Sequence, residues 1–327
     1  MNKVSFFIIG APKSGTSFIR KYLNLHPNIY IPEQEPVFMG DELSDLSEFK
    51  DIDTYHNLFG ENLFSKNIKC GEKSSMYLAT NAYKNIFKYN SDAKIILTIR
   101  NPIEAVYSYH NHNKIMGFEY INDFREAWDA QKMREKNNYK LPLYANNEKL
   151  RYKYKFIYSY SNHINNYSKY FNKNFKIIFY DDIKQDSKKV INDLFLFLNL
   201  EKLNLDSYEF KVVNKQPKVD IEKSFSNLFF RYRVFLPRKT SIKKISKSVK
   251  KILGNKILKF LFDKIFSLGF KINKLNTKLK IENNDVNKLI KSNHNEIKDK
   301  EFLIKEFNQE INFLSKKFNR NLDHWTK

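Results

Sequence analysis

Cysteine is nearly absent from this chain, because Cys70 is the only one among its 327 residues. A single cysteine cannot form an internal disulfide, and this composition is typical of a reducing compartment. No apolar run reaches the roughly 18 residues that a membrane-spanning helix needs, and residues 1–20 do not resemble a cleaved secretory signal. The sequence also has no HExxH motif and no paired-cysteine cluster. We therefore expect a cytoplasmic protein without a bound metal ion.

Acidic residues are scarce in one window of the chain. Residues 231–280 hold 16 lysines and arginines but a single acid, Asp263, so they carry +15 of the net charge of +22. Such a surplus can attract nucleic acid, an anionic membrane surface or an acidic substrate. Apolar residues recur at helical spacing between the lysines, which predicts helices packed on the core, lying on a membrane surface or facing an acidic glycan. Nucleic acid is not expected, because the aromatic residues fall on the apolar stripe.

Apolar runs at residues 4–10, 94–100 and 175–180 predict central strands of a sheet, and residues 67–75 predict a shorter one. Helical patterns lie between these runs. This alternation predicts an α/β fold with a mostly parallel sheet covered by helices on both faces. In such sheets ligands bind beyond the carboxyl ends of the strands. The residues that follow the predicted strand ends are Lys13, Glu72, Arg100 and Tyr180.

Residues 10–17 read Gly-Ala-Pro-Lys-Ser-Gly-Thr-Ser, between the first apolar run and a helical pattern. A strand, a loop of small residues and a helix start form a phosphate cradle, since free N–H groups and the positive helix end face the anion. Gly15 lets the backbone approach the ligand, and Lys13 adds a positive charge. Hydroxyl donors follow at Thr16 and Ser17. The nucleoside-triphosphate motif G-x-x-x-x-G-K-[ST] fits poorly, because Thr16 stands where its lysine belongs.

A second anion site is predicted at Arg100. This residue ends an apolar strand pattern, and the Asn101-Pro102 that follows is suited to the start of a helix. An arginine in this place can form two hydrogen bonds to a phosphate. Ser108 lies in the second turn of the helix and can reach the same group. Taken alone, Arg100 could pair with a surface carboxylate and Ser108 could be solvated. The two residues together with the loop at Lys13 favour a second anion site.

Together, the loop around Lys13 and the spacing from Arg100 to Ser108 resemble the 5′-phosphosulfate and 3′-phosphate sites of sulfotransferases that use 3′-phosphoadenosine 5′-phosphosulfate (PAPS). Three further segments are similar to that family: Gly-Glu-Lys-Ser-Ser at 71–75, Phe-Tyr-Asp-Asp-Ile at 179–183 and Leu-Asp-His-Trp at 322–325. The resemblance covers residues 4–200 well and the last 30 residues moderately. It implies a P-loop-like fold and in-line transfer of a sulfuryl group to a hydroxyl or amine, without a metal ion.

The resemblance also assigns roles to single residues. Lys13 would neutralise charge on the bridging oxygen as its bond breaks, and Lys73 would assist near the sulfuryl group. The residues that would hold the 5′-phosphate are Ser14, Gly15, Thr16 and Ser17, and those that would hold the 3′-phosphate are Arg100 and Ser108. Lys215 is the one candidate for a contact that covers the ligand, because the family's late Gly-x-x-Gly-x-x-Lys loop is absent.

Residues 35–38 resemble the Glu-x-x-Phe segment that carries the base in carbohydrate sulfotransferases, so Glu35 is the expected catalytic base. Glu33 remains an alternative, because residues two apart point the same way on an extended segment. Some family members use a histidine base instead. That possibility adds the weaker candidates His56, His110 and His112.

These patterns favour a PAPS-dependent sulfotransferase of bacterial type that acts on a carbohydrate and releases adenosine 3′,5′-bisphosphate. A nucleotide kinase with the same type of loop and a non-enzymatic membrane- or polyanion-binding protein remain as alternatives. Tyrosine, lipid and small-molecule acceptors also remain open. We expect an α/β core over 1–222, a basic amphipathic helical insertion over 223–285, and a C-terminal helix over 286–327 that completes the core. The basic segment could hold the protein at the inner face of the membrane.

Overall fold

The computed structural model describes residues 3–116, 118–119, 121–136, 149–210 and 286–327. The chain forms two compact units. The first contains residues 1–108, 153–215 and 302–327, and the second contains 109–152 and 216–301. The predicted basic insertion at 223–285 and the candidate contact Lys215 lie outside the described residues.

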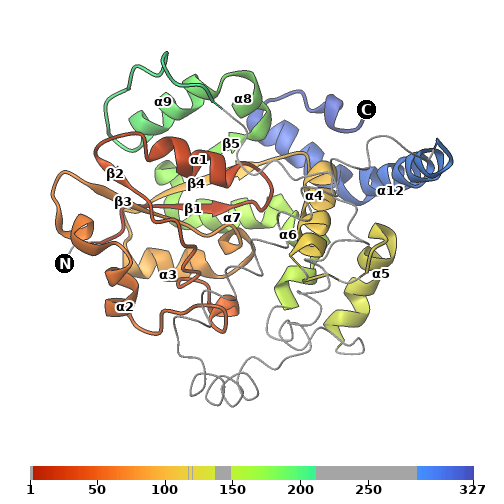
Figure 1. Cartoon of the computed structure of the whole chain (residues 1–327), viewed down its shortest axis with the longest axis horizontal. Helices are drawn as coiled ribbons and strands as arrows, with labels where there is room; N and C mark the ends of the chain where they lie inside the picture. Colours follow the sequence, from red (N-terminus) through yellow and green to blue (C-terminus); the bar gives the residue numbers. More distant parts are fainter. Residues whose placement is uncertain (1–2, 117, 120, 137–148, 211–285) are drawn as a thin grey trace, which may run out of the picture. The chain divides into compact units, whose positions relative to one another are not determined.

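Five parallel strands form the sheet of the first unit, in the spatial order β2-β3-β1-β4-β5 (Figure 1). Their bounds are Phe6–Gly10 for β1, Ile29–Tyr30 for β2, Lys69–Lys73 for β3, Lys94–Ile99 for β4 and Phe175–Phe179 for β5. The expected α/β fold with a parallel sheet is confirmed. Because β2 and β3 lie on one side of β1 and β4 and β5 on the other, the strand order reverses at β1, where open α/β sheets bind their ligands.

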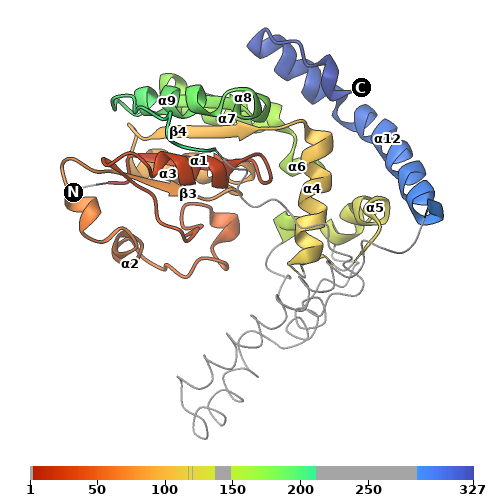
Figure 2. The same ribbon diagram turned by 45° about the horizontal axis from the view of Figure 1, so that its top comes forward.

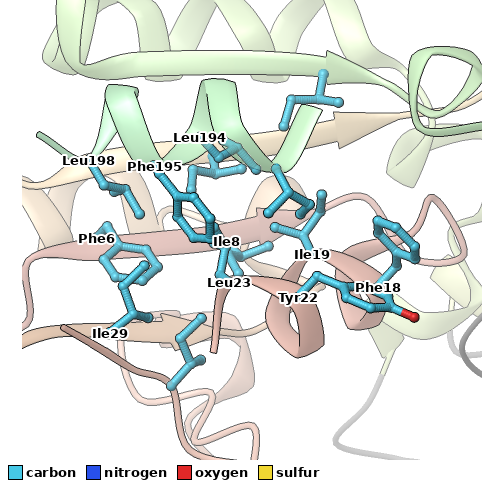
Figure 3. Close-up of a cluster of buried hydrophobic side chains, with 14 of the residues drawn as sticks. Phe6, Ile8, Phe18, Ile19, Tyr22, Leu23, Ile29, Leu194, Phe195 and Leu198 are labelled. Atoms are coloured by element: carbon cyan, nitrogen blue, oxygen red, sulfur yellow. The ribbon is translucent and has the colours of Figure 1, made fainter. Parts of the chain in front are cut away.

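One face of the sheet packs against α1 (Thr16–Leu23) and α9 (Ser187–Phe197) through a cluster of buried apolar side chains (Figure 3). Alternate residues of a strand point to the same face, so Phe6 and Ile8 of β1 both join the cluster. The other members labelled in Figure 3 are Phe18, Ile19, Tyr22, Leu23, Ile29, Leu194, Phe195 and Leu198. Each fully buried side chain of this size contributes about 1.5–3 kcal/mol, and together they fix α1 and the loop before it against the sheet.

The opposite face is covered by α3 (Ala82–Tyr89) and α7 (Tyr160–Phe171), which also contact each other. Phe7 of β1 points to this face, and its ring packs edge-on against Tyr89 with 6.5 Å between the centroids. The ring of Tyr167 lies 5.8 Å from that of Phe175 at the start of β5. The sheet is therefore buried between two helical layers, as the alternation of strands and helices predicts.

The other helices of the described residues are α2 (Ile52–Asn57), α4 (Pro102–Ile115), α5 (Phe124–Glu135), α6 (Tyr154–Ile157), α8 (Tyr180–Gln185) and α12 (Val286–Phe318). Short 3-10 turns span Asp41–Leu43, Gly60–Phe64, Tyr77–Ala79, Lys149–Tyr152, Asn172–Asn174 and Asp323–Trp325. The helical pattern over 150–171 is divided at Tyr158, where α6 ends before α7 begins. Among the described residues, no helix combines the length and apolar character needed to cross a membrane.

In the second unit, a buried ion pair lies beside α5. The guanidinium of Arg134 donates two hydrogen bonds to the carboxylate of Glu119, at 2.7 and 2.8 Å. Both side chains are almost completely buried, and the guanidinium lies 4.6 Å from the centre of the Tyr152 ring. Because each charge is satisfied by the other in paired geometry, burial of the two is tolerated.

The carboxyl ends of β4 and β5 are held by the last residues of the chain. The indole of Trp325 donates a 2.7 Å hydrogen bond to Asp181, the second residue of α8, and the ring nitrogen of His324 lies 3.0 Å from the same carboxylate. Asn101, next to the predicted anion ligand Arg100, donates to the carbonyl of Trp325 at 2.9 Å. Burial opposes ionisation of Asp181, but these donors and Lys184 outweigh it and lower its pKa to about 2.

We predict that the bond between Trp325 and Asp181 stabilises the fold measurably. Trp325→Phe keeps an aromatic ring but removes the N–H, and a hydrogen bond to a charged group contributes about 1.5–3 kcal/mol. Urea unfolding of Trp325→Phe, Asp181→Asn and the double variant at pH 7 gives the coupling free energy directly. Additive losses in the double variant would contradict the prediction.

The same carboxylate gives stability a pH dependence of known sign. Its pKa in the folded chain lies below the ordinary value of 3.8, so its contribution is complete above that value and disappears as the pH falls towards about 2. The difference in unfolding free energy between the wild-type protein and Asp181→Asn should therefore shrink between about pH 4 and pH 2.

Candidate active site

The loop between β1 and α1 has the backbone that an anion cradle requires. Lys13 and Gly15 both have positive φ angles, 61° and 96°, so the loop turns sharply before α1 begins at Thr16. Gly15 caps α1 without a side-chain hydrogen bond, which leaves the first N–H groups of the helix available to a ligand. A Cβ atom at Gly15 would lie only 3.1 and 3.2 Å from two ring carbons of Tyr180, so both the conformation and the available space demand glycine.

Neighbouring segments fix the loop through its backbone. The N–H of Ala11 donates to the carbonyl of Thr98 in β4 at 2.7 Å, and the Thr98 hydroxyl donates to the carbonyl of Gly10 at 2.9 Å. The buried hydroxyl of Tyr158 donates to the carbonyl of Pro12 at 3.0 Å. These bonds fix the backbone of the loop, so a ligand bound to it would meet a preorganised backbone.

Arg100 follows β4 directly, at the point where β4 leads into α4 (Figure 2). Its guanidinium donates from Nε and Nη2 to the carboxylate of Glu104, at 2.9 and 2.6 Å, and Nη1 lies 3.4 Å from the carbonyl of Lys13. The guanidinium carbon lies 5.0 Å from the centre of the Tyr180 ring. The Tyr160 hydroxyl donates to the backbone carbonyl of Arg100 at 3.1 Å. Arg100 is therefore joined to the loop at Lys13, as the two-site hypothesis needs.

Ser108 lies in the second turn of α4 and is half-buried. Residues four apart share one face of a helix, so Ser108 is on the same face as Glu104, the residue that holds Arg100. The structure thus places Ser108 one turn beyond Glu104, on the helix face that also carries the partner of Arg100.

Three cations gather at the carboxyl end of the sheet. Burial lowers the pKa of Lys13, and the positive charges of Arg100 and Lys73 lower it further. Lys13 is therefore close enough to Arg100 and to Lys73 to be repelled by both. A ligand with several negative charges would remove this repulsion, so the electrostatics of the site fit a polyanion.

Lys73, the last residue of β3, joins this cation cluster to the predicted base. Its side chain is 7% exposed, its ammonium forms an ion pair with the carboxylate of Glu35, and it lies 3.4 Å from the Ser17 hydroxyl at the start of α1. The second oxygen of Glu35 accepts hydrogen bonds from the backbone N–H and the hydroxyl of Ser75, at 3.0 and 3.2 Å. The sequence segments around positions 17, 35 and 73 therefore meet at one point.

The two candidate glutamates have different surroundings. The Glu33 side chain is 95% exposed and lies 3.6 Å from Arg20, whereas Glu35 is 35% exposed and points into the cation cluster. Burial tends to raise the pKa of Glu35, but the charge of Lys73 and the hydrogen bonds from Lys73 and Ser75 outweigh it and lower the pKa. Glu35 is therefore ionised at neutral pH and able to accept a proton.

The hydroxyl residues of the loop differ in how they could meet a ligand. Ser14 is fully buried and its hydroxyl donates to the carbonyl of Pro12 at 3.4 Å, within the loop itself. Thr16 is also buried, whereas Ser17 is half-buried beside Lys73. Ser17 therefore has the most accessible hydroxyl among the three.

Two of the histidine candidates have structural partners. His56 lies 2.9 Å from the Tyr89 hydroxyl, and burial lowers its pKa. In the second unit, burial lowers the pKa of His110 to about 4, and its ring nitrogen lies 3.0 Å from the carbonyl of Ile121. His112 lies in α4, in the second unit. Within the described part of the chain, no group of His, Cys, Asp and Glu side chains could hold a metal ion.

Sequence reasoning missed the tyrosines that support the site. Tyr158 and Tyr160 hold the carbonyls of Pro12 and Arg100, and no local pattern marks them because they are distant from both segments in sequence. Glu72 was expected after the end of a strand, but it lies inside β3, because β3 extends one residue further, to Lys73.

Comparison with known proteins supplies a family. Residues 3–261 match the model of the family described as "Sulfotransferase domain". The solved structure of a sulfotransferase from Alicyclobacillus acidocaldarius is similar with a TM-score of 0.54 and 25% identity, over 72% of this chain and 95% of that one.

The mouse and human heparan sulfate glucosamine 3-O-sulfotransferases 5 are each 24% identical to this chain over 169 residues. The match covers 50% of this chain and 44% of each relative. The chain therefore spans less than half of the length of these curated relatives.

The surroundings of Glu35 give a prediction that needs no assay of function. Lys73→Met removes the charge and the hydrogen bond that lower the pKa of Glu35, while the opposing effect of burial stays. We expect the pKa of Glu35 to rise, as measured by ¹³C NMR titration of its carboxyl carbon. The exposed Lys88→Met change is the control, and it should leave the titration in place. An unchanged pKa in Lys73→Met would show that the ion pair does not form in solution.

Proposed function

The chain belongs to the sulfotransferase domain family and is a sulfotransferase, and we propose that it transfers the sulfuryl group of PAPS to a hydroxyl or amine of a carbohydrate, with Glu35 as the base. One observation carries the proposal. The ammonium of Lys73 is bonded to Glu35 and lies beside Ser17 of the anion loop, so a proton acceptor stands next to a cradle for a phosphosulfate.

The donor fits the two anion elements. Its 5′-phosphosulfate lies on the N–H groups at the start of α1, beside Lys13 and Ser17. Its 3′-phosphate takes Arg100, with Ser108 as a second contact. The guanidinium already donates two bonds to Glu104, so the 3′-phosphate must compete with this carboxylate for Arg100.

Sulfuryl transfer resembles phosphoryl transfer in needing alignment and stabilisation of charge. The acceptor oxygen or nitrogen forms a bond to sulfur as the bond from sulfur to the bridging oxygen breaks, and the bisphosphate leaves with the electron pair. Lys13 meets the charge that grows on this oxygen. Because burial and two nearby cations destabilise its charged form, Lys13 gains more from that negative charge than a solvated lysine would.

Glu35 takes the acceptor's proton. Its lowered pKa keeps it ionised at neutral pH, and general bases of this kind contribute about 10²–10⁴ in rate. Lys73 holds one oxygen of the carboxylate and Ser75 the other, which directs the group. The ammonium of Lys73 also lies where it can stabilise the sulfuryl oxygens during transfer.

A carbohydrate acceptor is supported by the two curated relatives, which are named for a heparan sulfate glucosamine, and by the resemblance of residues 35–38. A tyrosyl, lipid or small-molecule acceptor would require the same donor site and base, and acceptor screening separates them. The predictions of a cytoplasmic location and of anionic membrane contact through 231–280 stay proposals. So does the division at 222 and 285, because the basic insertion lies outside the described residues.

We predict that the two glutamates differ in function. Glu35→Gln keeps the shape of the side chain but removes the base, so turnover with PAPS should fall by about 10²–10⁴, with little change in donor affinity. Glu33→Gln is the matched control, since Glu33 is almost fully exposed, and should retain near-normal turnover. Loss of turnover in Glu33→Gln but not in Glu35→Gln would identify Glu33 as the base.

A second prediction concerns the donor site. Arg100→Ala should weaken the binding of adenosine 3′,5′-bisphosphate by about 10- to 100-fold, since hydrogen bonds to charged groups contribute about 1.5–3 kcal/mol. The same change should weaken the binding of adenosine 5′-phosphosulfate far less, because that nucleotide has no 3′-phosphate. Glu104→Gln should strengthen the binding of the bisphosphate by about two- to fivefold, because this factor corresponds to the free energy of an exposed ion pair.

Calorimetric titration measures these affinities, with ATP–Mg²⁺ as the comparison ligand. Equal losses of affinity for the two nucleotides in Arg100→Ala would show that Arg100 does not contact the 3′-phosphate. Binding of ATP–Mg²⁺ without binding of the bisphosphate would favour the kinase alternative, and binding of neither would leave only a polyanion- or membrane-binding role.

A further inference from the structure

The last two residues of β3 point to opposite faces of the sheet. Lys73 lies on the face of α1, where it contacts Ser17 and Glu35. Glu72 points the other way, as alternation along a strand requires, and its carboxyl is completely buried. Burial of a carboxyl is costly unless its oxygens are hydrogen-bonded, so the partners of this group need a physical explanation.

Three hydroxyl groups surround this carboxyl. Tyr55 donates to Oε2 at 2.6 Å, Ser74 donates to Oε1 at 2.8 Å, and Tyr77 forms a further hydrogen bond. Burial raises the pKa of Glu72 to about 7 even though these donors favour the ionised form. Each hydroxyl has a single proton, so a hydroxyl that donates to Glu72 must present its lone pairs to something else.

Two of the three hydroxyls present their lone pairs to the loop that carries Glu35. The Ser74 oxygen accepts the backbone N–H of Val37 at 3.2 Å. The Tyr77 oxygen accepts the backbone N–H of Met39 at 2.7 Å, in a buried position. Glu72 therefore sets the direction of both hydroxyls, and through them it holds two amides of one loop.

The loop needs such support because its backbone is strained. Val37 has a φ of 47°, a left-handed conformation that costs a β-branched residue of order 1–3 kcal/mol. Glu35 lies two residues before this point. The end of β3 thus holds the loop from both faces, with Lys73 on the Glu35 side chain and the hydroxyls around Glu72 on the backbone that follows.

We propose that Glu72 is a positioning residue, which orients the hydroxyls of Ser74 and Tyr77 to fix the backbone at Val37 and Met39 and thereby holds the Glu35 carboxylate in place for transfer. This inference rests on the proposed role of Glu35 as the base. In this proposal Glu72 touches neither the donor nor the acceptor. It acts on the loop through two hydroxyl groups, those of Ser74 and Tyr77.

The chain offers a closely matched pair of variants. Tyr77→Phe and Tyr55→Phe each remove one buried hydroxyl that bonds to Glu72, and Tyr77→Phe also leaves the buried N–H of Met39 without its acceptor. Only Tyr77 relays to the loop. Among the described residues, the Tyr55 hydroxyl bonds to Glu72 and not to the backbone of residues 35–39. Its ring, which stacks on Phe38 at 4.6 Å between centroids, remains in the variant.

The experiment compares Glu72→Gln, Tyr77→Phe and Tyr55→Phe by turnover, donor KM and hydrogen exchange of the peptide that contains Val37 and Met39. We expect Tyr77→Phe and Glu72→Gln to lower kcat by about 10- to 100-fold, the cost of misplacing a catalytic group, with an unchanged KM for PAPS and faster exchange of that peptide. In Tyr55→Phe, the decrease in log kcat should be less than half of that in Tyr77→Phe. Hydrogen exchange of the peptide with Val37 and Met39 should stay as slow as in the wild-type protein.

Non-additive losses in the double variant Glu72→Gln/Tyr77→Phe would support action through one relay. Equal losses of kcat in Tyr55→Phe and Tyr77→Phe, or unchanged exchange in both Tyr77→Phe and Glu72→Gln, would overturn the proposal. If Glu72→Gln does not fold, the two tyrosine variants decide the question alone. If the wild-type protein fails to use PAPS, the proposed function fails, whereas the exchange measurement still tests whether the hydroxyls anchor the loop.

Discussion

The ion pair between Lys73 and Glu35 is the interaction on which the geometry of the site depends. It ties a loop with little regular structure to the end of a buried strand, and it places the same ammonium against the start of α1. Because the pair is only partly exposed, its attraction is screened less than that of a surface pair. Glu35, the loop before α1 and the sheet therefore share one contact, and a shift of any of them is transmitted to the others.

Backbone support is the second theme of the site. Hydroxyl groups from Tyr158, Tyr160, Ser74 and Tyr77 bind carbonyls or amides of the three segments that carry the functional side chains. A side chain that holds a backbone leaves the side chains of that segment available to the ligand. This division suits a reaction that depends on alignment and on fixed charges more than on covalent chemistry.

Much of the fold could be predicted from the sequence, because β1 and β4 are buried on both faces and appear as continuous apolar runs. The anion loop and Arg100 were also accessible, since the strand, the loop and the helix start are contiguous. Tertiary contacts set the rest. Glu33 and Glu35 are equivalent by spacing, and only Lys73 and Ser75, about forty residues away, distinguish them. The ion pair between Glu104 and Arg100 depends on rotamers that no motif encodes.

The ring of Tyr180 contacts both predicted anion elements, since its edge packs against Gly15 and the Arg100 guanidinium lies 5.0 Å from its centre. In evolutionary terms these three positions are not independent. A Cβ atom at position 15 would push the ring at 180 aside by a few tenths of an ångström, and a displaced ring would change its contact with the guanidinium. Among descendants of this chain, the three positions should therefore persist together or drift together, so that selection on the loop at Gly15 also constrains Arg100.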